Sequence, residues 1–223
     1  MSERVYNFSA GPACLPESVI KQAQKDLWNH MDSGIGIMEH SHRNKYFDKV
    51  TEETEALCRE VGNIPEDMAI FWMQGGATSQ CYFVPANFLP SDRTADYFQT
   101  GKWANDSINE VHHYGGLNIC GSSKDKNYSY IPKGDQVQYS DNPVYVQDFS
   151  KFGLVDAGAQ KNLGPSGITL VMAKKDIINN RVRDLPKMMQ FDLIAKKEGR
   201  YNTPNTFGVY LMGEVFKWIK AEG

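Results

Sequence analysis

The sequence contains no long hydrophobic run. None of its apolar stretches approaches the roughly 18 residues that a membrane helix requires. The N-terminal stretch MSERVYNFSAGP also lacks the apolar centre of a signal peptide. We therefore expect no membrane span and no leader, and a cytoplasmic location.

Cysteine is scarce, and its spacing does not suit disulfide bonds or a zinc site. Cys14, Cys58, Cys81 and Cys120 are the four cysteines of the chain, and no two of them form a C-x-x-C pair. Small disulfide scaffolds are far richer in cysteine, and zinc sites use closely spaced pairs of ligands. The sequence therefore predicts four reduced thiols and no metal centre.

An excess of charge of either sign is absent too. The chain has 24 Lys and Arg residues against 27 Asp and Glu residues, which gives a net charge of -3. This balance argues against a nucleic-acid or anionic-membrane partner, although it allows a local cationic pocket. With 41% hydrophobic residues, the composition is that of an ordinary globular protein.

Strand and helix patterns alternate from about residue 68. Short apolar runs indicate strands at 68–73, 94–99, 117–120, 144–146, 153–155 and 168–173. Helical spacing of apolar residues indicates helices at about 15–27, 46–61, 103–114 and 205–220, and another helix is expected after the glycine turn at 74–80. This alternation predicts an α/β fold with a mostly parallel sheet flanked by helices.

A glycine turn follows the first strand. Gly75 and Gly76 precede Thr78 and Ser79 near the expected start of a helix. Glycines allow a ligand to approach the backbone closely, and the free amides at a helix start suit a phosphate. A tight connection with a good helix cap would explain the same residues without a ligand.

Lys161 lies in a run of small residues, 157–167, between two expected strands. Small neighbours leave room for a bulky group against the amine. A partly desolvated lysine can act as a nucleophile or form a Schiff base. A surface lysine in a glycine-rich turn is the structural alternative.

Two further places could bind a ligand. His42 and Arg43 lie in a turn-like segment, where the guanidinium could hold a carboxylate or phosphate. Solvated turn residues are the alternative there. Trp103 opens a helix after a strand, so its ring could stack on a planar ligand or belong to the core.

Several segments occur together in one order along the chain. They are NFSAGPA (7–13), MEHSHR (38–43), QGG (74–76), ADY (95–97), TGKW (100–103), AGAQKNLGPSG (157–167) and YNTP (201–204). This succession resembles that of the phosphoserine aminotransferases, a family with the aspartate-aminotransferase-type fold. The resemblance covers nearly the whole chain, and its most specific parts are the first segment and the one around the lysine.

The resemblance implies a pyridoxal-phosphate (PLP) site. Lys161 would form the internal aldimine and move the proton between the substrate Cα and the C4′ atom of the cofactor. Trp103 would stack on the pyridine ring. Ala77, Thr78 and Gln160 would hold the cofactor phosphate.

The resemblance also implies a homodimer and a reaction. Asn202 and Thr203 match the pair that reaches the phosphate from the neighbouring subunit. Ser9, His42 and Arg43 would face the carboxylate or phosphate of the substrate. The implied reaction transfers an amino group between glutamate and 3-phosphohydroxypyruvate, which gives phosphoserine and 2-oxoglutarate in serine biosynthesis.

The sequence departs from the family pattern in three places. Thr78 stands where the family has an arginine. A neutral hydroxyl therefore replaces one positive charge that would contact the cofactor phosphate. Between residues 146 and 147 the chain lacks two strands and their crossover, including the aspartate that pairs with the pyridine nitrogen. Asp148 matches a different aspartate. We expect the small C-terminal domain of the family to be absent, so that residues 1–223 would form the PLP-binding large domain with its N-terminal segment.

The segment around residue 147 is also too short, on physical grounds, to contain a crossover connection between parallel strands. A crossover between parallel strands needs about a dozen residues, and 144–155 cannot contain one. Two other functions therefore stay open beside the transaminase. One is a catalytically silent homologue that binds a phosphate ligand or a full-length subunit. The other is a PLP transaminase for a different small amino acid.

Overall fold

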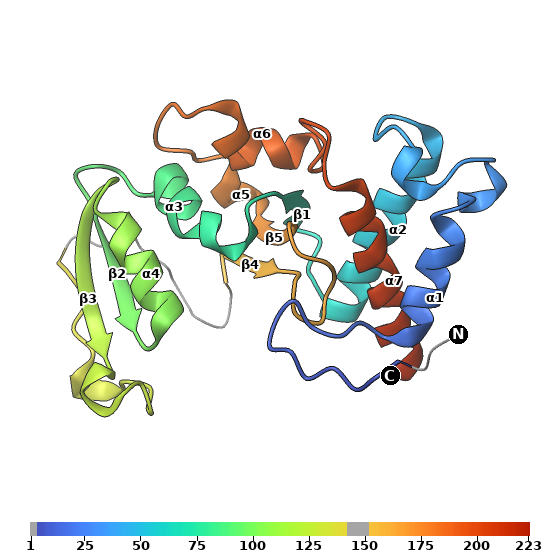
Figure 1. Cartoon of the computed structure of the whole chain (residues 1–223). Coiled ribbons are helices and arrows are strands. Elements are labelled where there is room, and N and C mark those ends of the chain that lie inside the picture. The colour runs from blue at the N-terminus through green and yellow to red at the C-terminus, as the bar shows by residue number, and fades with distance from the viewer. Residues whose placement is uncertain (1–3, 142–151) are drawn as a thin grey trace. The chain divides into compact units, whose positions relative to one another are not determined.

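The computed structural model describes residues 4–141 and 152–223. The expected strand at 144–146 and Asp148 lie outside the described residues. The chain divides into two compact units (Figure 1). The first consists of Met1–Gly76, Val155–Met172 and Ile194–Gly223, and the second of Ala77–Leu154 and Ala173–Leu193.

A three-stranded sheet belongs mainly to the first unit. Its strands are β1 (Met68–Met73), β5 (Thr169–Lys174) and β4 (Leu154–Gly158), in the order β1-β5-β4. The amide of Ala159 donates to the Ile168 carbonyl at 3.0 Å, and that of Lys174 donates to the Gly153 carbonyl at 2.8 Å. These two bonds make β4 and β5 an antiparallel pair. The connection between them is too short for the crossover that a parallel pair requires.

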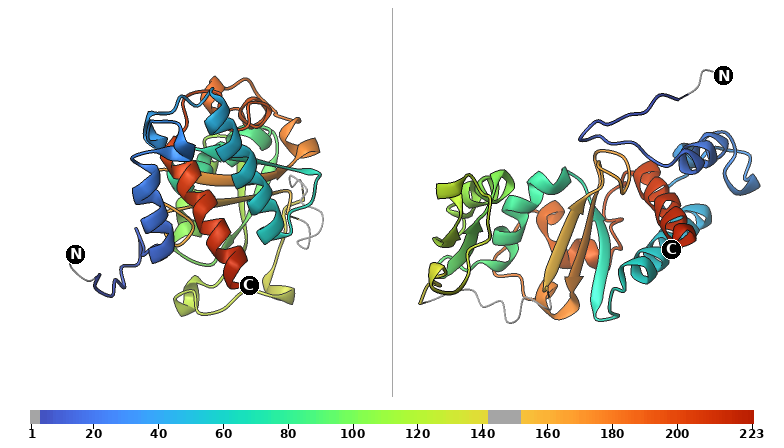
Figure 2. Two further views of the ribbon diagram at one scale, coloured as in Figure 1. Left: turned by 90° about the vertical axis from the view of Figure 1, so that its right-hand side faces the viewer. Right: turned by 90° about the horizontal axis from the view of Figure 1, so that it is seen from below.

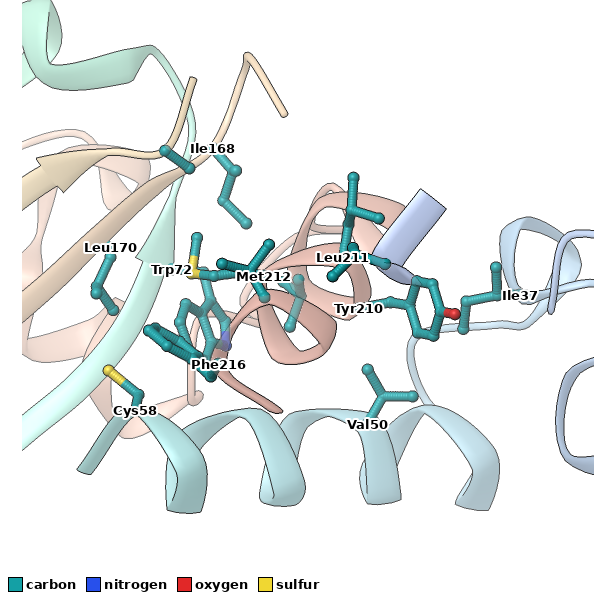
Figure 3. Packing of buried hydrophobic residues seen from close by; sticks show 14 of the residues in the cluster. Ile37, Val50, Cys58, Trp72, Ile168, Leu170, Tyr210, Leu211, Met212 and Phe216 are labelled. Carbon is teal, nitrogen blue, oxygen red and sulfur yellow. The ribbon is translucent and has the colours of Figure 1, made fainter. Parts of the chain in front are cut away.

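Three helices cover one face of this sheet. They are α1 (Glu17–Asp26), α2 (Lys45–Gly62) and α7 (Thr206–Glu222), and α1 and α2 each pack against α7 (Figure 2). Their apolar side chains form one core cluster with Ile70 and Trp72 of β1 and with Ile168 and Leu170 (Figure 3). The three helices and β1 confirm the expected segments to within about two residues at each end.

Helix α7 is buried on most of its sides. Val209, Tyr210, Leu211 and Met212 follow one another in sequence, and all four side chains are buried. Four successive positions of a helix point in all directions, so α7 must have protein around it. It lies between the sheet and the other two helices (Figure 2).

Gly213 allows α2 and α7 to approach closely. A Cβ atom at Gly213 would lie 2.4 Å from the Oγ1 atom of Thr54 in α2. That hydroxyl is buried and donates to the Val209 carbonyl at 3.5 Å. The contact therefore needs a residue without a side chain in the middle of α7.

Asparagines mark several helix ends in the first unit. The side chain of Asn44 accepts hydrogen bonds from the amides of Tyr46 and Phe47 and caps the start of α2. Asn63 adopts the left-handed conformation, with φ 47°, and ends the same helix. Asn205 caps α7 by accepting from the Gly208 amide at 2.9 Å.

The second unit contains a two-stranded parallel sheet. Its elements are α3 (Gly76–Phe88), β2 (Thr94–Gln99), α4 (Lys102–Val111), β3 (Gly116–Ser122) and α5 (Lys175–Ile178). The register runs from Thr94 opposite Gly116 and shifts between Tyr97 and Phe98. This pair confirms the parallel β-α-β arrangement expected between residues 94 and 120.

Smaller elements complete the chain. Helix α6 spans Phe191–Lys196, and 3-10 turns lie at His30–Asp32, Ile37–Glu39, Lys124–Lys126, Gly134–Gln136 and Lys187–Met189. The sequence patterns did not predict α5 or α6, which are only four and six residues long. No helix in the described ranges is long and apolar enough to cross a membrane.

Replacing Gly213 by valine should separate α2 from α7. The new side chain would overlap Thr54, and forced overpacking of a core costs about 1–3 kcal/mol. We expect the free energy of unfolding in urea to fall by that amount. Ala221→Val, at an exposed position of the same helix, is the matched control. It should change the free energy of unfolding by only a few tenths of the change expected for Gly213→Val. Equal stabilities of the two variants would contradict this packing.

Asp156 on β4 gives a second prediction. Ala157 packs against the core, so strand alternation directs Asp156 to the opposite face, where burial raises the pKa of its carboxyl. A raised pKa in the folded state means that stability falls as pH rises above the ordinary aspartate range. Asp156→Asn should therefore stabilise the protein at pH 7, and the gain should vanish near pH 3. Thermal melts at both pH values check this, and a gain that persists unchanged at pH 3 would refute it.

Candidate cofactor site

Lys161 lies in the loop that joins β4 to β5. The Gly164 amide donates to the Ala159 carbonyl at 2.9 Å and closes this loop. Gln160 and Lys161 are both exposed. The partial desolvation that the sequence suggested for the lysine is therefore absent in this single chain, because its small neighbours do not cover it.

Small residues hold the loop against α7. A Cβ atom at Gly164 would lie 3.4 Å from the Ala159 side chain and 3.7 Å from the Cβ of Met212. Ala159 and Gly164 are themselves buried. The glycines and alanines around Lys161 thus have a packing role, and they fix the loop to the helix while the lysine stays accessible.

The N-terminal segment lies beside this lysine. The Nζ atom of Lys161 donates to the Ala10 carbonyl at 2.7 Å, and the Ala13 amide donates to the Gln160 carbonyl at 3.0 Å. A Cβ atom at Gly11 would lie only 2.7 Å from Nζ. The sequence patterns did not predict this contact between residues about 150 positions apart.

Asn202 and Thr203 lie just before α7. Asn202 is half-buried and Thr203 is exposed. The side-chain amide of Gln74, at the end of β1, donates to the Thr203 carbonyl at 3.3 Å. This bond attaches the segment to the sheet, and no local sequence pattern predicts it.

The segment 39–43 is anchored by His40. The side-chain amide of Asn44 donates to Nδ1 of His40, and Nε2 of His40 lies 3.0 Å from the hydroxyl of Ser33. His40 is buried and so has a structural role. His42 is buried too, whereas the neighbouring Arg43 is exposed and forms no ion pair with any described residue.

His42 is held in its neutral form. Burial lowers the pKa of its imidazole, and the positive charges of Arg43 and Arg200 lower it further. Its Nε2 atom has no hydrogen-bond partner among the described residues. A buried polar atom of this kind is suited to a ligand hydrogen bond. Ser9 is exposed in the N-terminal segment.

The remaining expected site residues belong to the second unit. Helix α3 begins at Gly76, earlier than the turn suggested, and Ala77 and Thr78 are exposed in its first turn. Gly76 has φ 67°, and nothing lies within 4 Å of a Cβ placed there. Space for a ligand therefore exists beside the backbone at the start of this 13-residue helix.

Trp103 does not belong to the core. Its side chain is 64% exposed at the start of α4, and the ammonium group of Lys102 lies 4.8 Å from its ring centroid. The ring is therefore available to stack on a planar ligand.

Each of these side chains suits one part of PLP. In the first unit, the accessible amine of Lys161 suits the aldehyde. In the second unit, the exposed hydroxyl of Thr78 suits the phosphate, and the exposed indole of Trp103 suits the aromatic ring. A groove of about 760 Å³ between α1, α2 and α7 includes none of these residues in its lining. Within the described part of the chain, no three His, Cys, Asp or Glu side chains gather as metal ligands.

Known proteins are similar to this chain in sequence. The class-V aminotransferase family model matches residues 5–147 and, in a second match, residues 135–223. The phosphoserine aminotransferase of Lysinibacillus sphaericus is 37% identical over 100% of this chain and 72% of its own length. That of Herpetosiphon aurantiacus is 38% identical over 98% of this chain and 71% of its own. The first alignment extends over 259 positions, 36 more than the 223 residues of the chain.

Solved structures of phosphoserine aminotransferases are similar to this chain in fold. The phosphoserine aminotransferase from Bacillus circulans subsp. alkalophilus has a TM-score of 0.93 and 35% identity, over 99% of this chain and 71% of its own. PLP-bound phosphoserine aminotransferase from Trichomonas vaginalis has a TM-score of 0.91 and 27% identity, over 99% of this chain and 72% of its own. The chain therefore belongs to the class-V aminotransferases and, within them, to the phosphoserine aminotransferase family.

Proposed function

We propose that the chain is a PLP-dependent phosphoserine aminotransferase, which transfers an amino group between glutamate and 3-phosphohydroxypyruvate in serine biosynthesis. The observation that carries this proposal is the accessible amine of Lys161, in the loop between β4 and β5. Curated relatives with this activity in their names match the whole chain at 37–38% identity.

Residues of the chain would bind the cofactor and transfer the proton. PLP, when bound, supplies the electron sink for the charge that develops at the substrate Cα. Lys161 would hold the cofactor and carry the proton to and from that carbon. Thr78 and Ala77 would hold the phosphate with Gln160, and Trp103 would orient the ring.

Anion recognition would come from the 39–43 segment. The exposed guanidinium of Arg43 pairs with no acid among residues 4–141 and 152–223, so it can form charge-assisted bonds with a phosphate or carboxylate. Neutral His42 would add one hydrogen bond beside it. Ser9 would contribute its hydroxyl from the N-terminal segment.

A homodimer and a cytoplasmic location belong to the same proposal. Asn202 and Thr203 would reach the cofactor phosphate of the partner subunit, which makes the dimer part of the site. Tyr6 and Phe8 support a partner surface, because they are 93% and 91% exposed. Gln74 would hold the segment that crosses to the partner.

We also propose that the chain lacks an internal segment near residue 147 that its relatives contain. Support comes from the 36 extra positions of the alignment and from the two family matches that overlap at 135–147. The absent segment would contain the aspartate that pairs with the pyridine nitrogen. We therefore expect the cofactor to bind, and the turnover to be slower than that of a full-length relative.

Lys161→Ala should remove the proton carrier and the covalent attachment. We expect transamination of phosphoserine with 2-oxoglutarate to fall by about 10²- to 10⁴-fold, the usual contribution of a proton-transferring residue. Lys124→Ala, at an exposed position of the second unit, is the control and should keep the parent rate. Normal turnover by the Lys161 variant would exclude the proposed function.

Arg43→Ala tests the phosphate preference. Loss of a charge-assisted bond to the substrate should cost about 2 kcal/mol, or a factor of about thirty in kcat/KM for phosphoserine. The kcat/KM for serine or alanine should change far less. Lys49→Ala removes another exposed cation nearby and should leave the preference intact. An equal loss for phosphoserine and alanine would mean that Arg43 does not read the phosphate.

A further inference from the structure

Two hydrogen bonds attach the N-terminal arm, residues 4–14, to the loop that carries Lys161. One joins Ala13 to Gln160 through the backbone, and the other joins the Lys161 amine to the Ala10 carbonyl at 2.7 Å. The apolar side chains of the arm are not buried, since Val5, Tyr6 and Phe8 are all largely exposed. These polar contacts, rather than core packing, determine where the arm lies on the loop.

The Ala10 carbonyl is suited to orient the amine. A backbone carbonyl can only accept a hydrogen bond, so Lys161 must direct one N–H towards it. When the amine is neutral, its lone pair then points away from the arm and towards open space. A lysine on a four-carbon stem has little orientation of its own, because its free rotamers are numerous.

Gly11 makes room for this contact. With φ 153° it lies in a conformation that disfavours side chains, and a Cβ there would lie 2.7 Å from Nζ and 2.8 Å from Cδ of Lys161. Any other residue at this position would therefore push the amine away from the carbonyl.

We propose that Ala10 and Gly11 form the resting position of the Lys161 amine, which it occupies whenever it is not bonded to the cofactor. The arm is then a positioning element of the active site, since it orients the amine without touching the reaction itself. This inference rests on the proposed function, because that function gives the Lys161 amine its role in catalysis. The contact itself can be tested without turnover.

The test measures the accessibility of the amine in cofactor-free protein. The full chain is treated briefly with a low concentration of acetic anhydride, and acetylation of Lys161 is quantified by peptide mass spectrometry against exposed Lys124. Gly11→Ala displaces the amine from the carbonyl. Ala13→Pro removes the amide that donates to Gln160 and so loosens the arm. Gly34→Ala imposes a similar backbone strain, φ 85°, with nothing within 4 Å of the new side chain.

We expect Lys161 to react about threefold to tenfold faster in the Gly11 and Ala13 variants, the factor that corresponds to one ordinary hydrogen bond. Gly34→Ala should react at the parent rate. An unchanged Lys161 rate in either arm variant would overturn the inference. Failure of PLP to label Lys161 in the parent would instead exclude the proposed function, and the acetylation contrast would remain as a separate result.

Discussion

Helix α7 lies between the sheet and helices α1 and α2, with four successive buried side chains from Val209 to Met212. A helix with this composition cannot be stable on a surface, so the first unit must close around it. Gly213 sets the separation from α2, because Thr54 occupies the space that any side chain there would need. The burial of α7 is thus the constraint on which the arrangement of the first unit depends (Figure 3).

The candidate site is built on this helix. Met212 supports Gly164 in the Lys161 loop, and the segment with Asn202 and Thr203 leads directly into the helix. The N-terminal arm is attached in turn to the Lys161 loop. A lysine in an exposed loop can therefore be held in place by residues that are far from it in sequence, while its amine stays open to a cofactor.

Much of the fold could be predicted from local patterns. The apolar runs of β1, β2 and β5 and the helical spacing in α2 and α7 give clear signals, because each buries a continuous face. Lys161, Trp103 and Arg43 are accessible in the structure, and their ligand-binding roles stay predictions. The order of the motifs, rather than any one of them, indicated the family.

Other features depend on tertiary contacts and have no local signature. The antiparallel pairing of β4 and β5 follows from the short loop between them, and the expectation of parallel strands could not account for it. The bond from Lys161 to Ala10 joins residues 151 positions apart, and the one from Gln74 to Thr203 joins residues 129 apart. His40 shows the converse case, since a histidine in a promising motif is fully used by its neighbours.

The most direct test of this account is the attachment of PLP to the purified 223-residue chain. PLP is added, the visible absorption band is recorded, and the complex is reduced with borohydride before peptide mapping. We expect a visible band, with the label on Lys161. The absence of a band, or a label scattered over surface lysines, would contradict a cofactor site in this chain.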